Sequence, residues 1–110
     1  MNFLLENLRV AAEARIRAAR SGGVNLFTRQ LVASGEKVTI TGHTDFVGEP
    51  AENYNFGLRR AQGIRDILTK KGVSKTQISC KSQGDRKPVA TNDTPYGRYL
   101  NRRVEIRVRK

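Results

Sequence analysis

The central part of the sequence predicts a strand, a helix and a second strand in direct succession. Residues 37–41 alternate apolar and polar side chains and are rich in β-branched residues, which is typical of a half-buried strand. Residues 54–71 repeat apolar side chains at helical spacing and stop at Gly72, a residue type that commonly ends helices. Residues 78–83 alternate again. Because two strands joined by a helix usually lie parallel in one sheet, this segment predicts a right-handed βαβ unit.

The flanking segments add a further strand and at least one more helix. Residues 103–109 alternate inward-facing apolar residues with charged residues, which indicates a sheet covered by helices on one side only. A helix is expected at about residues 24–34, closed by Gly35. Residues 8–17 hold either an earlier helix or a first strand, and residues 84–100 form a long loop of a kind that is usually functional or folded into a turn of helix.

These elements predict an α+β fold, an α/β sandwich of one domain. Its mixed parallel and antiparallel sheet is expected to have about four strands, with two or more helices packed on one face. No run approaches the roughly 18 apolar residues that cross a membrane. The N-terminus lacks the pattern of a signal peptide.

The single cysteine and single histidine limit which covalent links and metal sites the chain can form. The single Cys80 excludes an internal disulfide, and together with the single His43 it excludes a Cys/His zinc cluster. Cys80 falls in the strand pattern and is expected to be a small, inert, buried side chain. We expect no metal and no cofactor.

The chain is strongly basic. Its formal net charge of +11 raises the expectation of an anionic partner, such as nucleic acid, acidic lipid or an acidic cell-wall polymer. A nucleic-acid-binding surface should interleave aromatic and basic residues on one face. The three Tyr and four Phe residues follow no basic strand. A nucleic-acid-binding module is therefore the alternative, and nucleic acid is not the expected partner.

Two charged residues stand where a ligand could bind. Asp45 follows the first predicted strand, in a loop expected at residues 43–53, and Arg60 falls on the flank of the apolar stripe of the predicted helix. A charge at that flank must be paired or must line a cleft. A carboxylate and a guanidinium facing each other could clamp a ligand that carries an ammonium and a carboxylate. A structural salt bridge explains Arg60 about equally well.

Catalytic interpretations fit the sequence less well. His43 could serve as a base, but no nucleophile or acid pair stands at a matching spacing, so a histidine that holds its loop by hydrogen bonds is favoured. Asp45 with Glu49 or Glu52 could form the carboxylate pair of a glycosidase, but these residues share one loop. We assign no catalytic residue and do not expect an enzyme.

Several short motifs, in order and at matching spacing, resemble the OmpA-like C-terminal domain, a family that includes peptidoglycan-associated lipoproteins and the periplasmic part of flagellar stator proteins. The motifs are Gly42-His43-Thr44-Asp45, the run from Asn53 through Phe56-Gly57-Leu58-Arg59-Arg60-Ala61, Gly72-Val73, Ile78, Gly84, Pro88 and Asn101-Arg102-Arg103-Val104-Glu105-Ile106. The resemblance covers about residues 36–109. It assigns residues 35–110 to the peptidoglycan-binding core and residues 1–34 to an N-terminal segment of the same domain. Gly57 stands where the family usually has Ser.

The resemblance implies non-covalent binding of peptidoglycan, in the periplasm, through the diaminopimelate of the stem peptide. It assigns the ligand's ammonium to Asp45 and a carboxylate to Arg60. Backbone amides near Gly57 and Leu58 are expected to favour the anion as part of a helix N-terminus. The remaining ligand-binding candidates are Thr44, Phe46, Asn53, Asn101 and Arg103, of which Phe46 could wall the cleft and the other four are expected mainly to frame it.

The same resemblance sets the expected partners. Besides peptidoglycan, the expected partners are other envelope proteins of a larger complex. Contact with a membrane is expected only through parts outside this chain. The alternative within the family is an envelope assembly module of the same fold that does not bind the wall.

Overall fold

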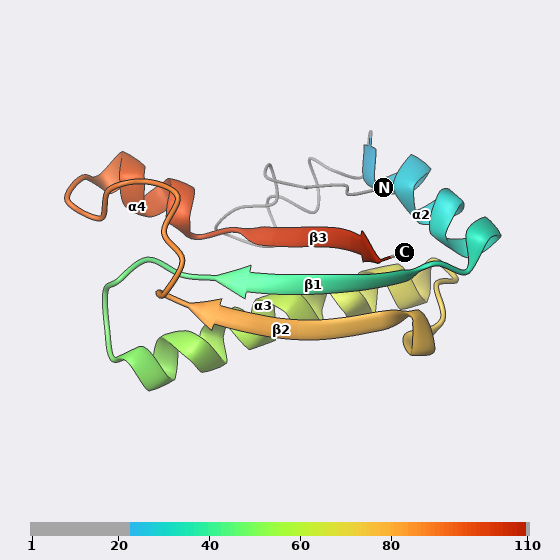
Figure 1. Ribbon diagram of the computed structural model, residues 1–110, viewed down its shortest axis with the longest axis horizontal. Coiled ribbons are helices and arrows are strands. Elements are labelled where there is room, and N and C mark those ends of the chain that lie inside the picture. The colour runs from blue at the N-terminus through green and yellow to red at the C-terminus, as the bar shows by residue number, and fades with distance from the viewer. Residues whose placement is uncertain (1–22, 110) are drawn as a thin grey trace.

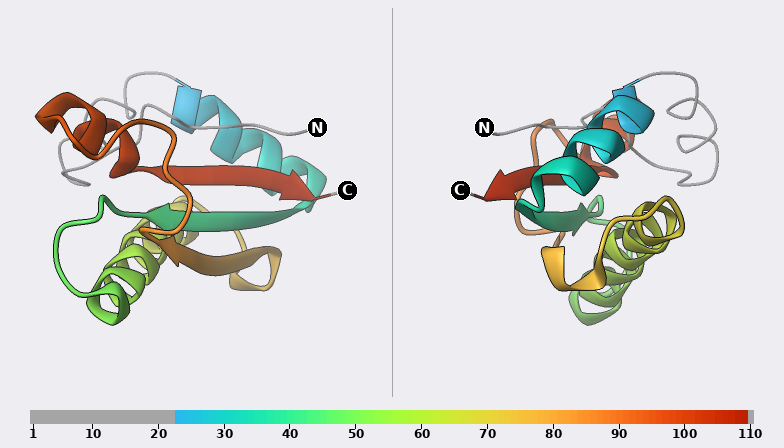
Figure 2. Two further views of the ribbon diagram at one scale, coloured as in Figure 1. Left: turned by 60° about the vertical axis from the view of Figure 1, so that its left-hand side comes forward. Right: turned by 90° about the vertical axis from the view of Figure 1, so that its right-hand side faces the viewer.

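The computed structural model describes the backbone of residues 23–109 and the side chains of residues 28–108. In chain order the elements are α2 (Gly23–Ser34), β1 (Lys37–His43), α3 (Pro50–Lys70), the short 3-10 helix η1 (Lys75–Gln77), β2 (Ile78–Gly84), α4 (Pro95–Asn101) and β3 (Val104–Arg109). The strands form one layer, and the long helix α3 packs along one face of it (Figures 1 and 2). This arrangement confirms the predicted α+β fold.

The sheet is mixed, with β1 in the centre. The strand order is β2-β1-β3. β1 runs parallel to β2, with Val38 opposite Ile78, and antiparallel to β3, with Gly42 opposite Val104. The parallel β1–β2 pair joined by α3 confirms the predicted βαβ unit. The described residues contain three of the expected four strands, and the candidate first strand at residues 8–17 lies outside them.

The core lies between the sheet and the helices. Alternation along β1 buries Val38 and Ile40 completely, and Ile106 on β3 is equally inaccessible. Ile78 and Cys80 on β2 are partly buried and pack against this core. Its buried members are Leu31, Val38, Ile40, Ala61, Ile64, Leu68, Val73, Val104, Ile106 and Val108. The inward faces predicted for β1 and β3 are therefore confirmed. Among residues 23–109, no helix is both long and apolar enough to cross a membrane.

The predicted start of α3 is wrong. The helix begins at Pro50 rather than at Tyr54, so the loop expected at residues 43–53 is shorter. Proline is well suited to the first helical turn, where its missing N–H would have no partner in any case. Arg60 consequently lies in the middle of α3, whereas a helix that began at Tyr54 would carry it in its first two turns.

Other boundaries differ less. β1 continues to His43 and β2 to Gly84, one or two residues beyond the predicted ends. The last part of the long loop folds into α4, where Pro95 opens the helix and the Thr94 hydroxyl accepts the Gly97 N–H at 3.0 Å. The loop between β1 and α3 and the helix α4 lie at the same end of the sheet (Figures 1 and 2).

A close approach of two glycines sets the distance between β1 and α3. A Cβ atom placed on Gly42 would collide with the backbone carbonyl of Gly57. A Cβ atom on Gly57 would in turn meet the Gly42 carbonyl oxygen at 2.9 Å and would clash with the Ser82 hydroxyl. The space that a serine would use at position 57 is thus already occupied by a serine from β2.

We predict that Gly42→Ala destabilises the domain by about 1–3 kcal/mol, because the new methyl group meets backbone atoms that cannot rotate away. Gly63→Ala is the matched control: Gly63 is exposed on α3 with no atom within 4 Å of its would-be Cβ. That control should gain about 0.5–1 kcal/mol, as alanine is the better helix former. Urea unfolding of both variants measures the difference, and equal stability of the two would contradict the close approach.

Candidate functional site

The charged residues of interest gather where β1 ends and β3 begins. Gly42 pairs with Val104 across the antiparallel ladder, and the His43 N–H donates to the Arg103 carbonyl at 2.9 Å. The residues that follow β1 therefore face the residues that precede β3. This register brings the loop after β1 next to Arg102. The loop lies at the end of the sheet that also carries α4 (Figure 1).

Asp45 is buried and firmly held. Its side chain is 10% exposed. Oδ1 accepts the backbone N–H of Val47 at 3.0 Å, and Oδ2 pairs with Nη1 of Arg102 at 2.5 Å. The carboxylate thus already has a cationic partner, and that partner is not Arg60.

Arg102 was named as part of a motif but not among the ligand-binding candidates, whereas its neighbours Asn101 and Arg103 were. Only the strand register shows which of these three consecutive side chains reaches Asp45. The Arg102 side chain is 30% exposed, so it is the more accessible partner of the pair.

Arg60 reaches the same region from α3. Its Nη1 donates to the carbonyl of His43 at 3.0 Å, and its guanidinium lies 5.9 Å from the centre of the Phe56 ring. Burial lowers the pKa of Arg60, the charge of Arg102 lowers it further, and the charge of Asp45 raises it. The region therefore holds one carboxylate and two guanidinium groups that act on one another, hereafter the Asp45–Arg60–Arg102 cluster.

Exposed aromatic side chains stand beside this cluster. Phe46, directly after Asp45, is 54% exposed, and Phe56 on α3 is 51% exposed. The Arg59 guanidinium lies 4.9 Å from the Phe56 ring centre, on the exposed part of the helix. Apolar surface of this kind can pack against the aliphatic parts of a ligand whose charged groups meet the cluster.

Thr44 and Asn53 fix the loop that carries Asp45. The Thr44 N–H donates to the Gly84 carbonyl at 2.8 Å, and its hydroxyl donates to the Asp45 carbonyl at 2.9 Å. The Asn53 amide donates to the same carbonyl at 3.4 Å and to Oδ2 of Asp85 at 3.2 Å. Both residues are buried, so the bonds shown by the structure position the loop.

Asn101 organises the chain between β2 and β3. It is completely buried, and its Oδ1 accepts the N–H groups of Val89 and Ala90 at 2.8 and 3.0 Å. Its Nδ2 donates to the Ala90 carbonyl at 3.0 Å and to Oδ1 of Asn92 at 2.9 Å. These four bonds occupy the amide's full hydrogen-bonding capacity within the protein.

Arg103 has a similar framing position. It is 2% exposed and donates to Glu105, to the Asn101 carbonyl and to the Lys87 carbonyl at 2.8, 3.2 and 2.9 Å. Through its own carbonyl it also anchors the backbone of His43. Arg103 therefore supports the strand end from which the Asp45 loop departs.

The expected contribution of backbone amides at Gly57 and Leu58 is wrong. Because α3 begins at Pro50, both residues lie inside the helix, where N–H groups bond to carbonyls one turn earlier. Gly57 is buried against β1 and Leu58 is half-buried. Neither amide belongs to the four unpaired donors of a helix N-terminus.

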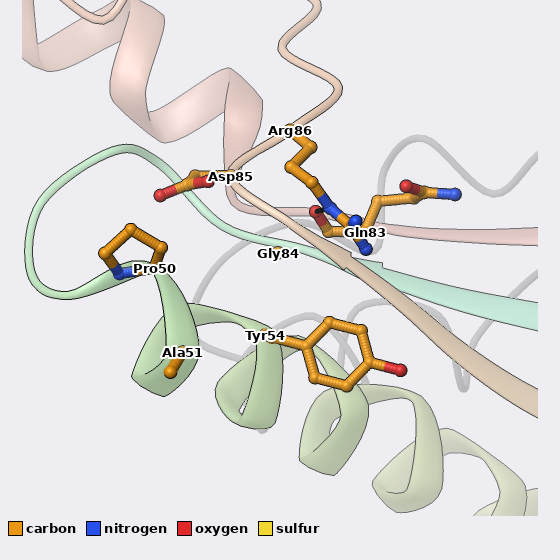
Figure 3. A pocket seen from close by; sticks show the side chains of 7 residues that line it. All are labelled: Pro50, Ala51, Tyr54, Gln83, Gly84, Asp85 and Arg86. Carbon is orange, nitrogen blue, oxygen red and sulfur yellow. Dashed lines mark hydrogen bonds between the residues drawn. The ribbon is translucent and has the colours of Figure 1, made fainter.

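A groove of about 330 Å³ lies between the start of α3 and the end of β2 (Figure 3). Pro50, Ala51 and Tyr54 line it from the helix, and Gln83, Gly84, Asp85 and Arg86 line it from β2 and the following loop. The Arg86 guanidinium sits 5.7 Å from the Tyr54 ring centre. Tyr54 and Arg60 are about 120° apart around the helix axis, so the groove and the cluster face different directions.

The His43 side chain is buried, at 3% exposure, and neither of its ring nitrogens has a hydrogen bond. The loop is held by the backbone of His43 and not by its imidazole, so the expectation that this side chain holds the loop by hydrogen bonds is wrong. Burial lowers the pKa of His43 from 6.5 to about 4; the Arg103 charge adds to this effect, and Glu105, with Oε2 3.6 Å from Nε2, opposes it. The imidazole is consequently neutral at pH 7.

Comparison with known proteins identifies the family. The sequence pattern of the OmpA family matches residues 11–102, which is more than half of the chain. The chain therefore belongs to the OmpA family, as the resemblance of its motifs indicated.

Two relatives and one solved structure illustrate the match. The chain is 42% identical over 71 residues to outer membrane porin F of Pseudomonas fluorescens, which covers 64% of this chain and 22% of that protein. It is 36% identical over 84 residues to the peptidoglycan-associated lipoprotein of Pseudomonas putida, which covers 76% and 51%. The cell wall anchor of the T6SS from Pseudomonas aeruginosa superimposes with a TM-score of 0.63 at 31% identity, covering 74% and 60%. The chain thus spans about half or less of these two relatives.

We predict that acid destabilises the domain through His43. The unfolded chain binds a proton at His43 near pH 6.5 and the folded chain only near pH 4, so this contribution is complete above pH 6.5 and is lost as the pH falls toward 4. The loss should be about 3 kcal/mol. Urea unfolding of the parent and of His43→Leu at several pH values measures it, because the carboxylates titrate in both proteins and cancel in the difference. A difference that stays constant from pH 7 to pH 4 would contradict the buried, neutral imidazole.

Proposed function

We propose that this domain binds peptidoglycan non-covalently through the diaminopimelate of the stem peptide, and thereby tethers an envelope protein to the cell wall. The observation that carries the proposal is the Asp45–Arg60–Arg102 cluster, in which a buried carboxylate and two guanidinium groups converge at one end of the sheet. The free end of a diaminopimelate side chain carries an ammonium and a carboxylate, so it offers a complementary charge to each kind of group.

Each charged group of the ligand has a partner of defined geometry. The ammonium binds the carboxylate of Asp45, whose orientation is fixed by the Val47 N–H. The ligand's carboxylate binds the guanidinium of Arg60, which spends one of its five N–H donors on the His43 carbonyl. A planar guanidinium can hold a carboxylate through two parallel bonds, which gives direction as well as strength.

The names of two similar proteins support binding to the cell wall in general. A peptidoglycan-associated lipoprotein and a cell wall anchor are both proteins named for attachment to the wall. By this proposal the domain works in the periplasm, is carried by a membrane-anchored protein, and performs binding rather than catalysis. Its further partners are other proteins of the same envelope complex.

We predict that Asp45→Asn and Arg60→Gln each weaken binding to purified sacculi by at least about thirtyfold. Removing one member of a desolvated charged pair typically costs about 2–5 kcal/mol, which corresponds to that loss or more. Sedimentation of the protein with sacculi, with free meso-diaminopimelate as competitor, measures the effect. Thermal unfolding of each variant establishes that it is folded.

The matched controls are Asp66→Asn and Arg65→Gln. These residues form an exposed ion pair, with side chains 59% and 32% exposed, so a carboxylate and a guanidinium are again removed, here from the helix that also carries Arg60. They should bind sacculi like the parent. If all four variants bind equally well, the clamp is refuted. If binding instead falls steeply with salt, is indifferent to Asp45 and Arg60, and extends to DNA or RNA, the basic surface is a nucleic-acid-binding one.

A further inference from the structure

Arg102 is paired with the same carboxylate to which the proposed function assigns the ligand's ammonium. Its Nη1 pairs with Oδ2 of Asp45 at 2.5 Å, while Oδ1 of the same carboxylate faces the backbone of its own loop. The oxygen of Asp45 that does not bond to the loop therefore already has a cationic partner. A second cation that arrives from solvent has to compete with Arg102 for that oxygen.

The two partners of this pair differ in freedom to move. The backbone carbonyl of Asp45 accepts hydrogen bonds from Thr44 and Asn53, and the Asp45 side chain is 10% exposed. Arg102 comes directly after α4 in the chain, and its side chain is 30% exposed. A long, partly solvated arginine can change rotamer at little cost. The carboxylate is thus the stationary member and the guanidinium the mobile one.

We infer that Arg102 is a specificity-determining residue, which leaves Asp45 when the ligand's ammonium arrives and then binds the ligand's carboxylate together with Arg60. This inference rests on the proposed function and names a third residue for it. After the exchange, the ammonium is paired with Asp45, and the carboxylate lies between two guanidinium groups. Every charged group of the cluster and of the ligand then has an opposite charge beside it.

This exchange favours a ligand whose end carries both an ammonium and a carboxylate over a ligand whose end carries an ammonium alone. A ligand that ends in an ammonium alone, as lysine does within a peptide, would also displace Arg102 from Asp45. It would leave Arg60, Arg102 and its own ammonium around a single carboxylate, with no anion to receive Arg102. Three cations gathered around one carboxylate repel one another strongly where burial reduces the screening by water.

The test uses two tripeptides that differ at one residue. Both are L-alanyl-γ-D-glutamyl peptides with a C-terminal amide, and the third residue is meso-diaminopimelate in one and lysine in the other. Isothermal titration calorimetry of each peptide with the parent protein and with Arg102→Gln gives four dissociation constants. The ratio of the two constants for one protein is its preference for the zwitterionic end.

We predict that Arg102→Gln reduces this preference about tenfold or more. The variant loses a contact to the carboxylate of diaminopimelate. It also lacks the guanidinium that lysine would displace from Asp45 and leave without an anion, so both changes lower the preference. Arg102→Lys keeps the positive charge but lacks the planar guanidinium, so its ratio of the two dissociation constants should be intermediate. Arg107→Gln removes the same charge from an exposed position on the outer part of β3 and should leave the ratio unchanged.

The possible outcomes distinguish a failure of the proposed function from a failure of the role given to Arg102. If the parent binds neither peptide, the proposed function fails and Arg102 loses its role with it. If the parent prefers diaminopimelate and Arg102→Gln keeps the same preference, only the role of Arg102 is refuted. Should Arg102→Gln fail to fold, the ratio for Arg102→Lys decides, and a ratio equal to that of the parent counts against the exchange.

Discussion

The packing of β1 directly against α3 at Gly42 and Gly57 is the constraint on which the rest of the structure depends. With no side chain on either residue, the strand backbone and the helix backbone approach within contact distance. The end of β1 is thereby fixed over the middle of α3, so that the His43 carbonyl meets the Arg60 guanidinium. A bulkier pair would push strand and helix apart and would separate the loop that carries Asp45 from the helix that carries Arg60.

The charges at this end of the sheet form two groups that differ in burial. In the more buried group, Arg103 is paired with Glu105 and bonded to backbone carbonyls, and His43 is neutral because burial and the charge of Arg103 disfavour its protonated form. The other group is the Asp45–Arg60–Arg102 cluster, which is less buried and carries one positive charge more than negative. The buried group holds the framework, and the positive excess of the cluster suits a ligand that brings its own carboxylate.

The sequence predicted the parts of the fold that local pattern controls. Alternation of β-branched residues located β1 and β3 and their inward faces, and the helical repeat with Gly72 located α3 and its end. It also drew attention to Asp45 and Arg60, because a charge after a strand and a charge beside an apolar stripe both require a partner. The start of α3 was missed, since Pro50 is as typical of a loop as of a first helical turn.

What the sequence could not give is the register between distant segments. Arg102 stands between two other polar residues, and only the pairing of Gly42 with Val104 selects it as the partner of Asp45. For the same reason the buried roles of Asn101 and Arg103, and the missing hydrogen bonds of His43, depend on contacts between residues far apart in the chain.

A crystal structure of the domain with the diaminopimelate tripeptide bound tests the central claim most directly. The ligand's ammonium should lie about 3 Å from the Asp45 carboxylate, with its free carboxylate against the guanidinium of Arg60. A ligand bound in the groove beside Tyr54 with Asp45 still paired only to Arg102, or bound anywhere else on the surface, would contradict it.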